Sequence, residues 1–268
     1  MTEKKTIPAL LKRKAENKKI SALTAYDYPT ALIADRADID ILLVGDSLGM
    51  SVLGYETTMP VSMEDMLHHT AAVVRGSKNS LIVADMPFGS YEADKKEALR
   101  NAVKLIKAGA QAVKLEGGLE RLETISAITN AGIPVMAHIG LLPQTATLMD
   151  GYRVQGKDES SAQLLIETAQ KLEAAKVFSI VLECVTSETA KRITESVDIP
   201  TIGIGAGAHC DGQVLVVHDM LGITSGHVPK FVKKYAALSD EMEKSFKAYK
   251  EDVEAGTFPA DGQSFFMK

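Results

Sequence analysis

The chain has 268 residues, of which 46% are hydrophobic, and its formal net charge is −5. An acidic chain without a basic stripe argues against a nucleic-acid-binding protein. No run approaches the ~20 apolar residues of a membrane span, and the first residues lack the apolar centre of a signal peptide. The two cysteines, Cys184 and Cys210, have neither disulfide nor metal-ligand spacing. We therefore expect a cytoplasmic protein that binds neither nucleic acid nor membranes.

Apolar runs and helical patterns alternate along the chain from its first helix, for which Thr6 is the expected N-cap and Pro8 lies in the first turn. Eight strands are expected, at residues 20–24, 41–44, 81–85, 112–116, 135–138, 179–183, 201–204 and 213–217. Further helices are expected at residues 29–38, 62–75, 93–108, 160–175 and 187–197, with one more ending near 131 and a long polar one at 229–255.

This alternation predicts one domain over residues 1–268, since no linker or change in composition divides the chain. The strands are near-continuous apolar runs, as expected where helices cover both faces of a parallel sheet. Eight strand–helix repeats favour a (βα)8 TIM barrel with an N-terminal helix and a long C-terminal helix. An open doubly wound sheet is the alternative.

Five of the apolar runs end at an ionisable residue. They end at Asp46 (in Gly45-Asp-Ser47), Asp85, Glu116, His138 and Glu183. In parallel α/β folds the carboxyl ends of the strands carry the chemistry, because the loops there vary over a rigid scaffold. The five endings therefore indicate one shared site.

Lys114 and Glu116 are two apart in one strand and therefore point to the same face. A lysine between Val113 and Leu115 needs a partner, because an unpaired buried charge is costly. We expect Glu116 or a bound anion to supply it. The alternative is a buried ion pair with no catalytic part.

Asp46, Asp85 and Glu116 offer the hard oxygen ligands that Mg²⁺ prefers. The alternative for both aspartates is a role in a turn or helix cap. Glu183 is a candidate general base, because burial raises the pKa of a carboxyl group, or else a salt-bridged strand end. His138 is a candidate metal ligand, acid–base group or oxyanion donor, or a satisfied core histidine.

Gly203-Ile-Gly-Ala-Gly207 follows the seventh strand, where barrels often bind phosphate. No helix opening follows it, so we expect a tight turn that lets the backbone approach a ligand. We expect Cys184, which continues an apolar strand, to be buried, and Cys210, in a loop, to be exposed.

Eight motifs together resemble the ketopantoate hydroxymethyltransferase family between Leu23 and Tyr235, in the family's order and spacing. One departure is Asp150, where the family usually has a second glycine. The motifs are Gly45-Asp-Ser-Leu-Gly-Met50, Leu53-Gly-Tyr55, Lys114-Leu-Glu-Gly-Gly118, His138-Ile-Gly-Leu-Leu-Pro-Gln144, Gly151-Tyr-Arg-Val-Gln-Gly156, Leu182-Glu-Cys184, Gly203-Ile-Gly-Ala-Gly207 and Gly226-His-Val-Pro-Lys-Phe231.

The resemblance implies a Mg²⁺-dependent barrel at the start of pantothenate biosynthesis. It implies transfer of a one-carbon unit from 5,10-methylenetetrahydrofolate to 3-methyl-2-oxobutanoate, and assembly as a large homo-oligomer, a decamer in the family. By position, Asp46 and Asp85 resemble direct metal ligands and Glu116 a third metal-site carboxylate. Asp46, Ser47, Asp85 and Lys114 resemble the substrate contacts, to which we add His138, and Glu183 resembles the proton acceptor.

Two other functions fit parts of the pattern. The first is another Mg²⁺-dependent α-keto-acid lyase or mutase barrel, but the Lys-Lys-Cys-Gly-His type of loop is missing from the sequence. The second is a non-catalytic scaffold barrel, which would have no reason to keep so many buried charges.

Overall fold

The computed structural model describes residues 4–146, 151, 153–224, 226 and 228–267. Asp150, Tyr152 and His227, which belong to the motifs above or flank them, lie outside the described residues. The chain divides into two compact units, residues 1–217 and 218–268. Each unit is described by itself, and a single domain over residues 1–268 stays a prediction.

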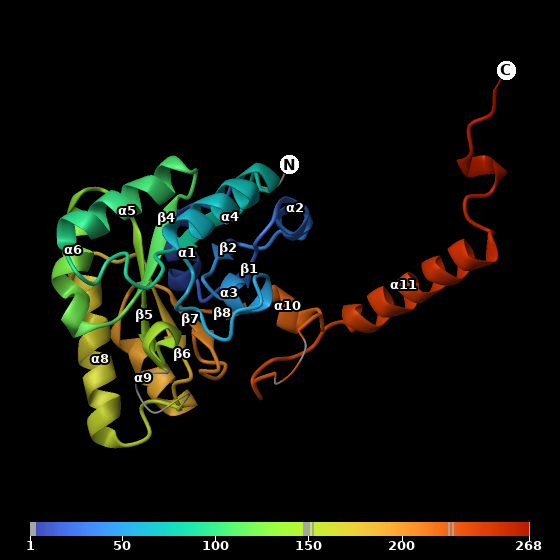
Figure 1. Ribbon diagram of the computed structural model, residues 1–268. Coiled ribbons are helices and arrows are strands. Elements are labelled where there is room, and N and C mark those ends of the chain that lie inside the picture. Colours follow the sequence, from blue (N-terminus) through green and yellow to red (C-terminus); the bar gives the residue numbers. More distant parts are fainter. Residues whose placement is uncertain (1–3, 147–150, 152, 225, 227, 268) are drawn as a thin grey trace. The chain divides into compact units, whose positions relative to one another are not determined.

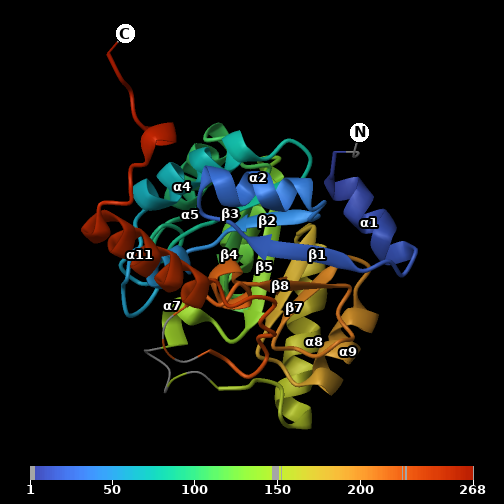
Figure 2. The same ribbon diagram turned by 90° about the vertical axis from the view of Figure 1, so that its right-hand side faces the viewer.

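The first unit is a closed barrel of eight parallel strands in chain order, which confirms the predicted (βα)8 fold (Figure 1). Its last strand pairs with its first, where the barrel closes (Figure 2). The strands are β1 (Ile20–Thr24), β2 (Ile41–Val44), β3 (Leu81–Asp85), β4 (Ala112–Glu116), β5 (Val135–Gly140), β6 (Ser179–Glu183), β7 (Thr201–Ile204) and β8 (Gly212–Leu215).

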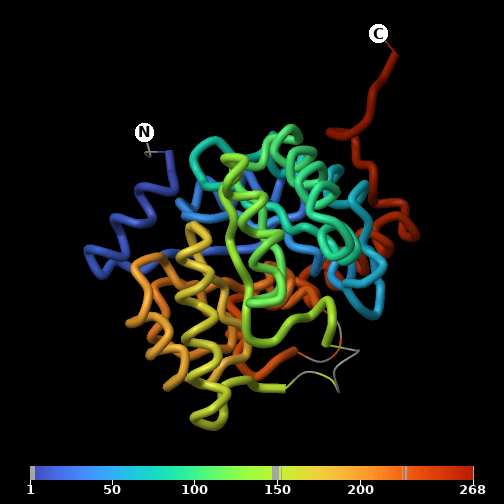
Figure 3. The backbone as a smooth tube through the Cα atoms, turned by 90° about the vertical axis from the view of Figure 1, so that its left-hand side faces the viewer, coloured from blue at the N-terminus to red at the C-terminus, as the bar shows by residue number. Residues whose placement is uncertain are grey.

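Helices surround this barrel, and α5 packs against α6 and α8 against α9 on its outside (Figure 3). Side-chain caps begin several of them, including Thr6 for α1 and the predicted Ser62–Asp65 capping box for α4. The helices are α1 (Ile7–Ala15), α2 (Tyr28–Arg36), α3 (Leu48–Ser51), α4 (Met63–Gly76), α5 (Lys95–Lys107), η1 (Leu119–Arg121), α6 (Leu122–Asn130), α7 (Pro143–Ala146), α8 (Glu159–Ala174) and α9 (Ser187–Ser196).

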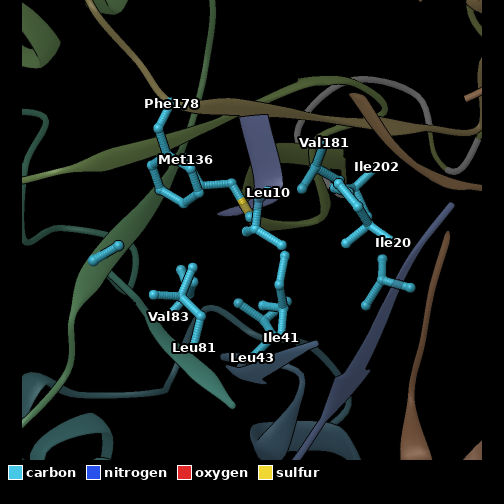
Figure 4. Packing of buried hydrophobic residues seen from close by; sticks show 12 residues of the cluster. Leu10, Ile20, Ile41, Leu43, Leu81, Val83, Met136, Phe178, Val181 and Ile202 are labelled. Atoms are coloured by element: carbon cyan, nitrogen blue, oxygen red, sulfur yellow. The ribbon is translucent and has the colours of Figure 1, made fainter. Parts of the chain in front are cut away.

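The hydrophobic core of the barrel gathers toward the end at which the strands begin (Figure 4). Ile20, Ile41 and Leu81 open β1, β2 and β3, and all are buried there. Leu10 of α1 packs into the same cluster and is 1% exposed. The N-terminal helix therefore covers this end of the barrel with an apolar side chain, while the carboxylates expected at the strand ends lie at the opposite end.

The second unit contains most of the short helix α10 (Val217–Met220), the long helix α11 (Leu238–Ala255) and η2 (Asp261–Gln263). The long helix was expected to begin near residue 229, and that boundary is wrong. The backbone N–H groups of Tyr235 and Leu238 donate to the carbonyls of Met220 and Leu221, at 2.7 and 2.9 Å. The chain before Leu238 is therefore held in an irregular conformation, and the helix starts only there.

The turn at Gly203-Ile-Gly-Ala-Gly207 is present, but the chain itself occupies the space beside its glycines. A Cβ on Gly203 would lie 2.9 Å from Cys210 Sγ, and one on Gly207 would meet Ser187. Cys210 is fully buried rather than exposed as expected, and Cys184 is only half-buried. In the described part of the chain, no helix is long and apolar enough to cross a membrane.

A buried carboxylate in the last turns of α2 anchors the loop that leads into β3. Asp35 Oδ1 accepts hydrogen bonds from Ser77 Oγ (2.7 Å) and from the backbone N–H groups of Asn79 and Ser80 (both 2.9 Å). Burial works to raise the pKa of Asp35, but these hydrogen bonds outweigh it and hold the pKa well below its usual range. The folded state is therefore stabilised by the ionised form of Asp35.

We predict that Asp35→Asn lowers the free energy of unfolding at pH 7 by about 1–3 kcal/mol, because one buried acceptor becomes a donor. The contribution of Asp35 is present above its unfolded pKa of about 4 and is lost as the pH falls below that value. Urea unfolding should therefore show that the free energy of unfolding falls less between pH 7 and pH 3 in Asp35→Asn than in the unmodified protein.

Asp38→Asn is the matched control, because Asp38 is half exposed and has a positive φ of 60° that asparagine tolerates. Identical pH dependence in Asp35→Asn and the unmodified protein would contradict the assignment.

Candidate active site

The structure brings the predicted strand-end residues together at one end of the barrel. Neighbouring strands pair in a register that sets Asp85 beside Lys114, Glu116 beside His138, and Gly140 beside Glu183. Asp46 lies two residues after the end of β2, and its backbone N–H donates to Asp85 Oδ2 at 3.1 Å. The barrel thus places residues from five consecutive strands around one centre.

Lys114 has a different partner from the one expected. Its Nζ lies 3.0 Å from Asp85 Oδ1, on the neighbouring strand, rather than pairing with Glu116. Lys114 is 5% exposed and Asp85 2% exposed. Burial works to lower the pKa of Lys114, but the charges of Asp85, Glu116 and Asp46 outweigh it and raise the pKa. The ammonium group therefore stays charged in the barrel.

The turn after β2 depends on the absence of a side chain at Gly45. A Cβ there would lie 2.9 Å from Ser47 Oγ and 3.5 Å from Asp85 Oδ2. Ser47 Oγ shares a hydrogen bond of 2.8 Å with the hydroxyl of buried Tyr26. Gly45 therefore allows the aspartate and the serine of the Gly-Asp-Ser motif to pack against β3.

His138 lies between two glutamates and the lysine. Its Nε2 is 3.2 Å from Glu183 Oε2, and its Nδ1 is 3.5 Å from Glu116 Oε1 and 3.4 Å from Lys114 Nζ. Burial and Lys114 lower the pKa of His138, but hydrogen bonds to Glu116 and Glu183 outweigh them and raise it to about 9. Because both ring nitrogens face these groups, His138 links Glu116 and Glu183, and a role as a metal ligand stays a prediction.

Hydrogen bonds and close packing hold the backbone on both sides of Glu183. Cys184, which follows it, has a positive φ of 48°, donates to Ile204 O at 2.9 Å and accepts from Gln155 N at 2.7 Å. A Cβ on Gly140 would collide with the carbonyl oxygen of Glu183. The side chain of Glu183 is 16% exposed and faces His138, so it is less buried than expected. The fold therefore fixes the backbone position from which this carboxylate reaches His138.

Two residues with no assigned role in the sequence also belong to the site. Gln144 of α7 donates from Nε2 to Asp46 Oδ2 at 2.7 Å, and its backbone N–H donates to Glu116 Oε2 at 3.1 Å. The hydroxyl of Tyr91 donates to Gln144 Oε1 at 2.6 Å. Gln144 closes one of the motifs quoted above, but an uncharged amide carries no signal of a buried charge. Tyr91 lies in a loop without any periodic pattern.

The charge at this centre suits a divalent cation. Burial raises the pKa of Asp46 well above its usual range, and the charges of Asp85 and Glu116 raise it further. Burial also raises the pKa of Asp85, although Lys114 opposes this. When all groups are ionised, the carboxylates exceed the cations by two charges; the carboxylates are Asp46, Asp85, Glu116 and Glu183, and the cations are Lys114 and His138.

Within the described ranges, no three His, Cys, Asp or Glu side chains form a ready metal cage. Magnesium needs only one or two carboxylates when water and substrate oxygens complete its shell. Asp46 and Asp85 fit that requirement. Both oxygens of Asp85 lie near Lys114 Nζ and the Asp46 N–H, and both oxygens of Glu116 lie near His138 and the Gln144 N–H. Asp46 and Asp85 as metal ligands, with Glu116 as a third metal-site carboxylate, therefore stay predictions.

Solved structures with the same architecture include phosphonopyruvate hydrolase in complex with oxalate and Mg²⁺ and 2,3-dimethylmalate lyase. The first is 13% identical, with a TM-score of 0.62 over 96% of this chain and 92% of that one. The second is 15% identical, with a TM-score of 0.61 over 97% and 91%. Similarity at such low identity concerns the fold alone.

The sequence comparisons are closer. Proteins called 3-methyl-2-oxobutanoate hydroxymethyltransferase from Syntrophomonas wolfei and Clostridium novyi are 55% and 56% identical, each over 98% of this chain and 96% of the relative. One from Enterococcus faecalis is 55% identical over 98% of this chain and 96% of the relative. The model of the ketopantoate hydroxymethyltransferase family matches residues 4–261. The chain therefore belongs to the ketopantoate hydroxymethyltransferase family.

Proposed function

We propose that this enzyme transfers a hydroxymethyl group from 5,10-methylenetetrahydrofolate to 3-methyl-2-oxobutanoate, giving ketopantoate at the start of pantothenate biosynthesis. The names of relatives more than half identical over nearly the whole chain support the acceptor and the group transferred. The observation that carries the proposal is the cluster of Asp46, Asp85 and Lys114 beside the His138–Glu183 pair. These groups suit binding of an α-keto acid and removal of a proton from it.

Asp46 and Asp85 would hold Mg²⁺, with Glu116 as a further carboxylate of the site. When bound, the cation supplies Lewis acidity at the keto oxygen, which makes the C3–H bond of the keto acid more acidic. Lys114 and Ser47 lie next to these aspartates and would bind the keto acid, as the ammonium offsets the charge of its carboxylate. His138 stays a predicted contact of the keto acid; its two ring nitrogens face Glu116 and Glu183, so it would orient these carboxylates beside the substrate.

Glu183 would remove the proton from C3 of the bound keto acid. Hydrogen bonds hold the backbone next to Glu183, and its side chain is partly exposed, so a substrate can reach the carboxylate. Water would add to the methylene carbon of the opened, iminium form of the folate, and loss of the folate nitrogen would release tetrahydrofolate and formaldehyde. The carbanion formed at C3 would then attack the formaldehyde carbon, and protonation of the resulting alkoxide gives the hydroxymethyl group on C3.

Neither alternative function is favoured by a specific observation. The likeness to phosphonopyruvate hydrolase and 2,3-dimethylmalate lyase, at 13% and 15% identity, reflects a common fold. A scaffold without catalysis would gain nothing from the buried Lys114, Asp85 and Asp46, since buried charges are costly unless paired.

Assembly as a homo-oligomer and a cytoplasmic location stay predictions. Supporting assembly, α11 exposes Met242, Phe246, Tyr249 and Val253, whose spacing puts them on one face of the helix. A partner subunit would cover such a face.

The first experiment tests proton removal without the folate. In deuterated water with Mg²⁺, the protein should exchange the C3 proton of 3-methyl-2-oxobutanoate, followed by NMR. Addition of EDTA should abolish the exchange, because the acidity of C3–H depends on the cation. If exchange continues at the same rate in EDTA, the metal part of the proposal is wrong. If it is absent with Mg²⁺, and still absent when tetrahydrofolate is added, the proposed substrate is wrong.

We predict that Glu183→Gln slows this exchange by about 10²–10⁴-fold while the affinity for the keto acid, measured by calorimetry, changes little. Glutamine has the same shape but cannot accept the proton. Glu188→Gln, an exposed glutamate in the first turn of α9, is the matched control and should exchange normally. Undiminished exchange in Glu183→Gln would assign the base to another residue.

We predict that Asp46→Asn weakens the binding of Mn²⁺, used in place of Mg²⁺, by at least about tenfold, because an anionic ligand becomes neutral. Affinity for the keto acid in the presence of Mn²⁺ should fall with it. Asp27→Asn is the matched control, since Asp27 caps α2 and asparagine caps equally well. Calorimetric titrations that give the same Mn²⁺ affinity for Asp46→Asn and the unmodified protein would exclude Asp46 as a ligand.

A further inference from the structure

Gln144 is the residue through which three strand ends of the barrel are joined. It lies in the short helix α7 and is 1% exposed. Its Nε2 donates to Asp46 Oδ2 at 2.7 Å and to the carbonyl of Met86 at 3.0 Å. Its backbone N–H donates to Glu116 Oε2 at 3.1 Å. Gln144 therefore contacts the residues that follow β2 and β3 and the residue that ends β4.

The partners of this amide allow only one orientation. The Met86 carbonyl can only accept a hydrogen bond, and so can an ionised Asp46, so the nitrogen of Gln144 must face both. The Tyr91 hydroxyl, 2.6 Å from Oε1, then donates to the oxygen. A flipped amide would point its oxygen at two acceptors. Every donor of the amide is thus used, and the side chain is held rigidly.

Tyr91 holds the side-chain amide of Gln144 in place through its hydroxyl group. It is 2% exposed, and its hydroxyl accepts a hydrogen bond from the backbone N–H of Glu116 at 3.2 Å while it donates to Gln144. A chain of hydrogen bonds therefore runs from the backbone of β4 through Tyr91 and Gln144 to the carboxylate of Asp46. Such outer partners fix the orientation of a metal-binding group.

We propose that Gln144 is a positioning residue that sets how Asp46 binds the cation. By occupying Oδ2, the amide leaves Oδ1 as the oxygen that Asp46 offers to the cation, and it prevents rotation of the carboxylate. The amide also offsets part of the repulsion between Asp46 and the neighbouring Asp85 and Glu116. This inference rests on the proposed function, which makes Asp46 a ligand of the divalent ion.

The test is the affinity for Mn²⁺ alone, measured by calorimetry without substrate or turnover. Gln144→Met keeps the length and volume of the side chain but removes the donor to Asp46. We expect its Mn²⁺ dissociation constant to rise by about 10–100-fold, as is usual when an outer partner of a metal ligand is lost.

Gln111→Met separates this role from a merely structural one. Gln111 precedes β4 at the opposite end of the barrel, and its Oε1 accepts the backbone N–H of Ile82 at 2.9 Å. Both substitutions remove a glutamine with a hydrogen-bonded amide and should lower stability in urea unfolding. Only Gln144→Met should weaken Mn²⁺ binding, while Gln111→Met should stay within about twofold of the unmodified protein.

Tyr91→Phe provides a second, milder variant if Gln144→Met does not fold. It leaves the bond from Gln144 to Asp46 in place but removes the support behind the amide, so we expect a weakening near the low end, about tenfold. The inference would be overturned if a folded variant, Gln144→Met or else Tyr91→Phe, had a Mn²⁺ dissociation constant within about twofold of that of the unmodified protein. Absence of Mn²⁺ binding in the unmodified protein would instead overturn the metal site of the proposed function.

Discussion

The ion pair between Lys114 and Asp85 is the interaction on which the charged end of the barrel depends. Both side chains are almost fully buried, and an unpaired charge there would be costly. Adjacent strands in register set the pair 3.0 Å apart, and the ammonium in turn makes the proximity of Asp46 and Glu116 tolerable. The strands that begin with apolar residues at the end covered by α1 therefore carry this cluster of ionisable side chains at their opposite ends.

Backbone geometry, more than side-chain choice, decides where these charges point. Gly45 leaves space for Asp85 and Ser47, and Gly140 leaves space for the carbonyl of Glu183. Cys184 adopts a left-handed conformation that carries a cost for any residue other than glycine. Such constraints hold the acid groups on rigid strand ends, as the proposed deprotonation of a small acid requires.

The comparisons separate the scaffold from the chemistry. Proteins at 13–15% identity have the same barrel, so the fold by itself does not select a reaction. Family membership rests on identity above one half over nearly the whole chain, together with the match over residues 4–261. What distinguishes this chain within the common architecture is the set of side chains at the strand ends, with Gln144 and Tyr91 behind them.

Sequence alone determined the eight strands, their order and the ionisable residues at or near the ends of five of them, because buried parallel strands are apolar runs. The expected ends of the fifth and eighth strands, at residues 138 and 217, are wrong, since these strands end at Gly140 and Leu215. Sequence did not determine that Lys114 pairs with Asp85, that Cys210 is buried or where α11 begins. Nor did it assign a role to Gln144, which meets Asp46 across 98 positions of chain. Periodicity reports which face of an element is buried, whereas the partner of a buried polar group is set by strand register and loop closure. Those exist only once the barrel has formed.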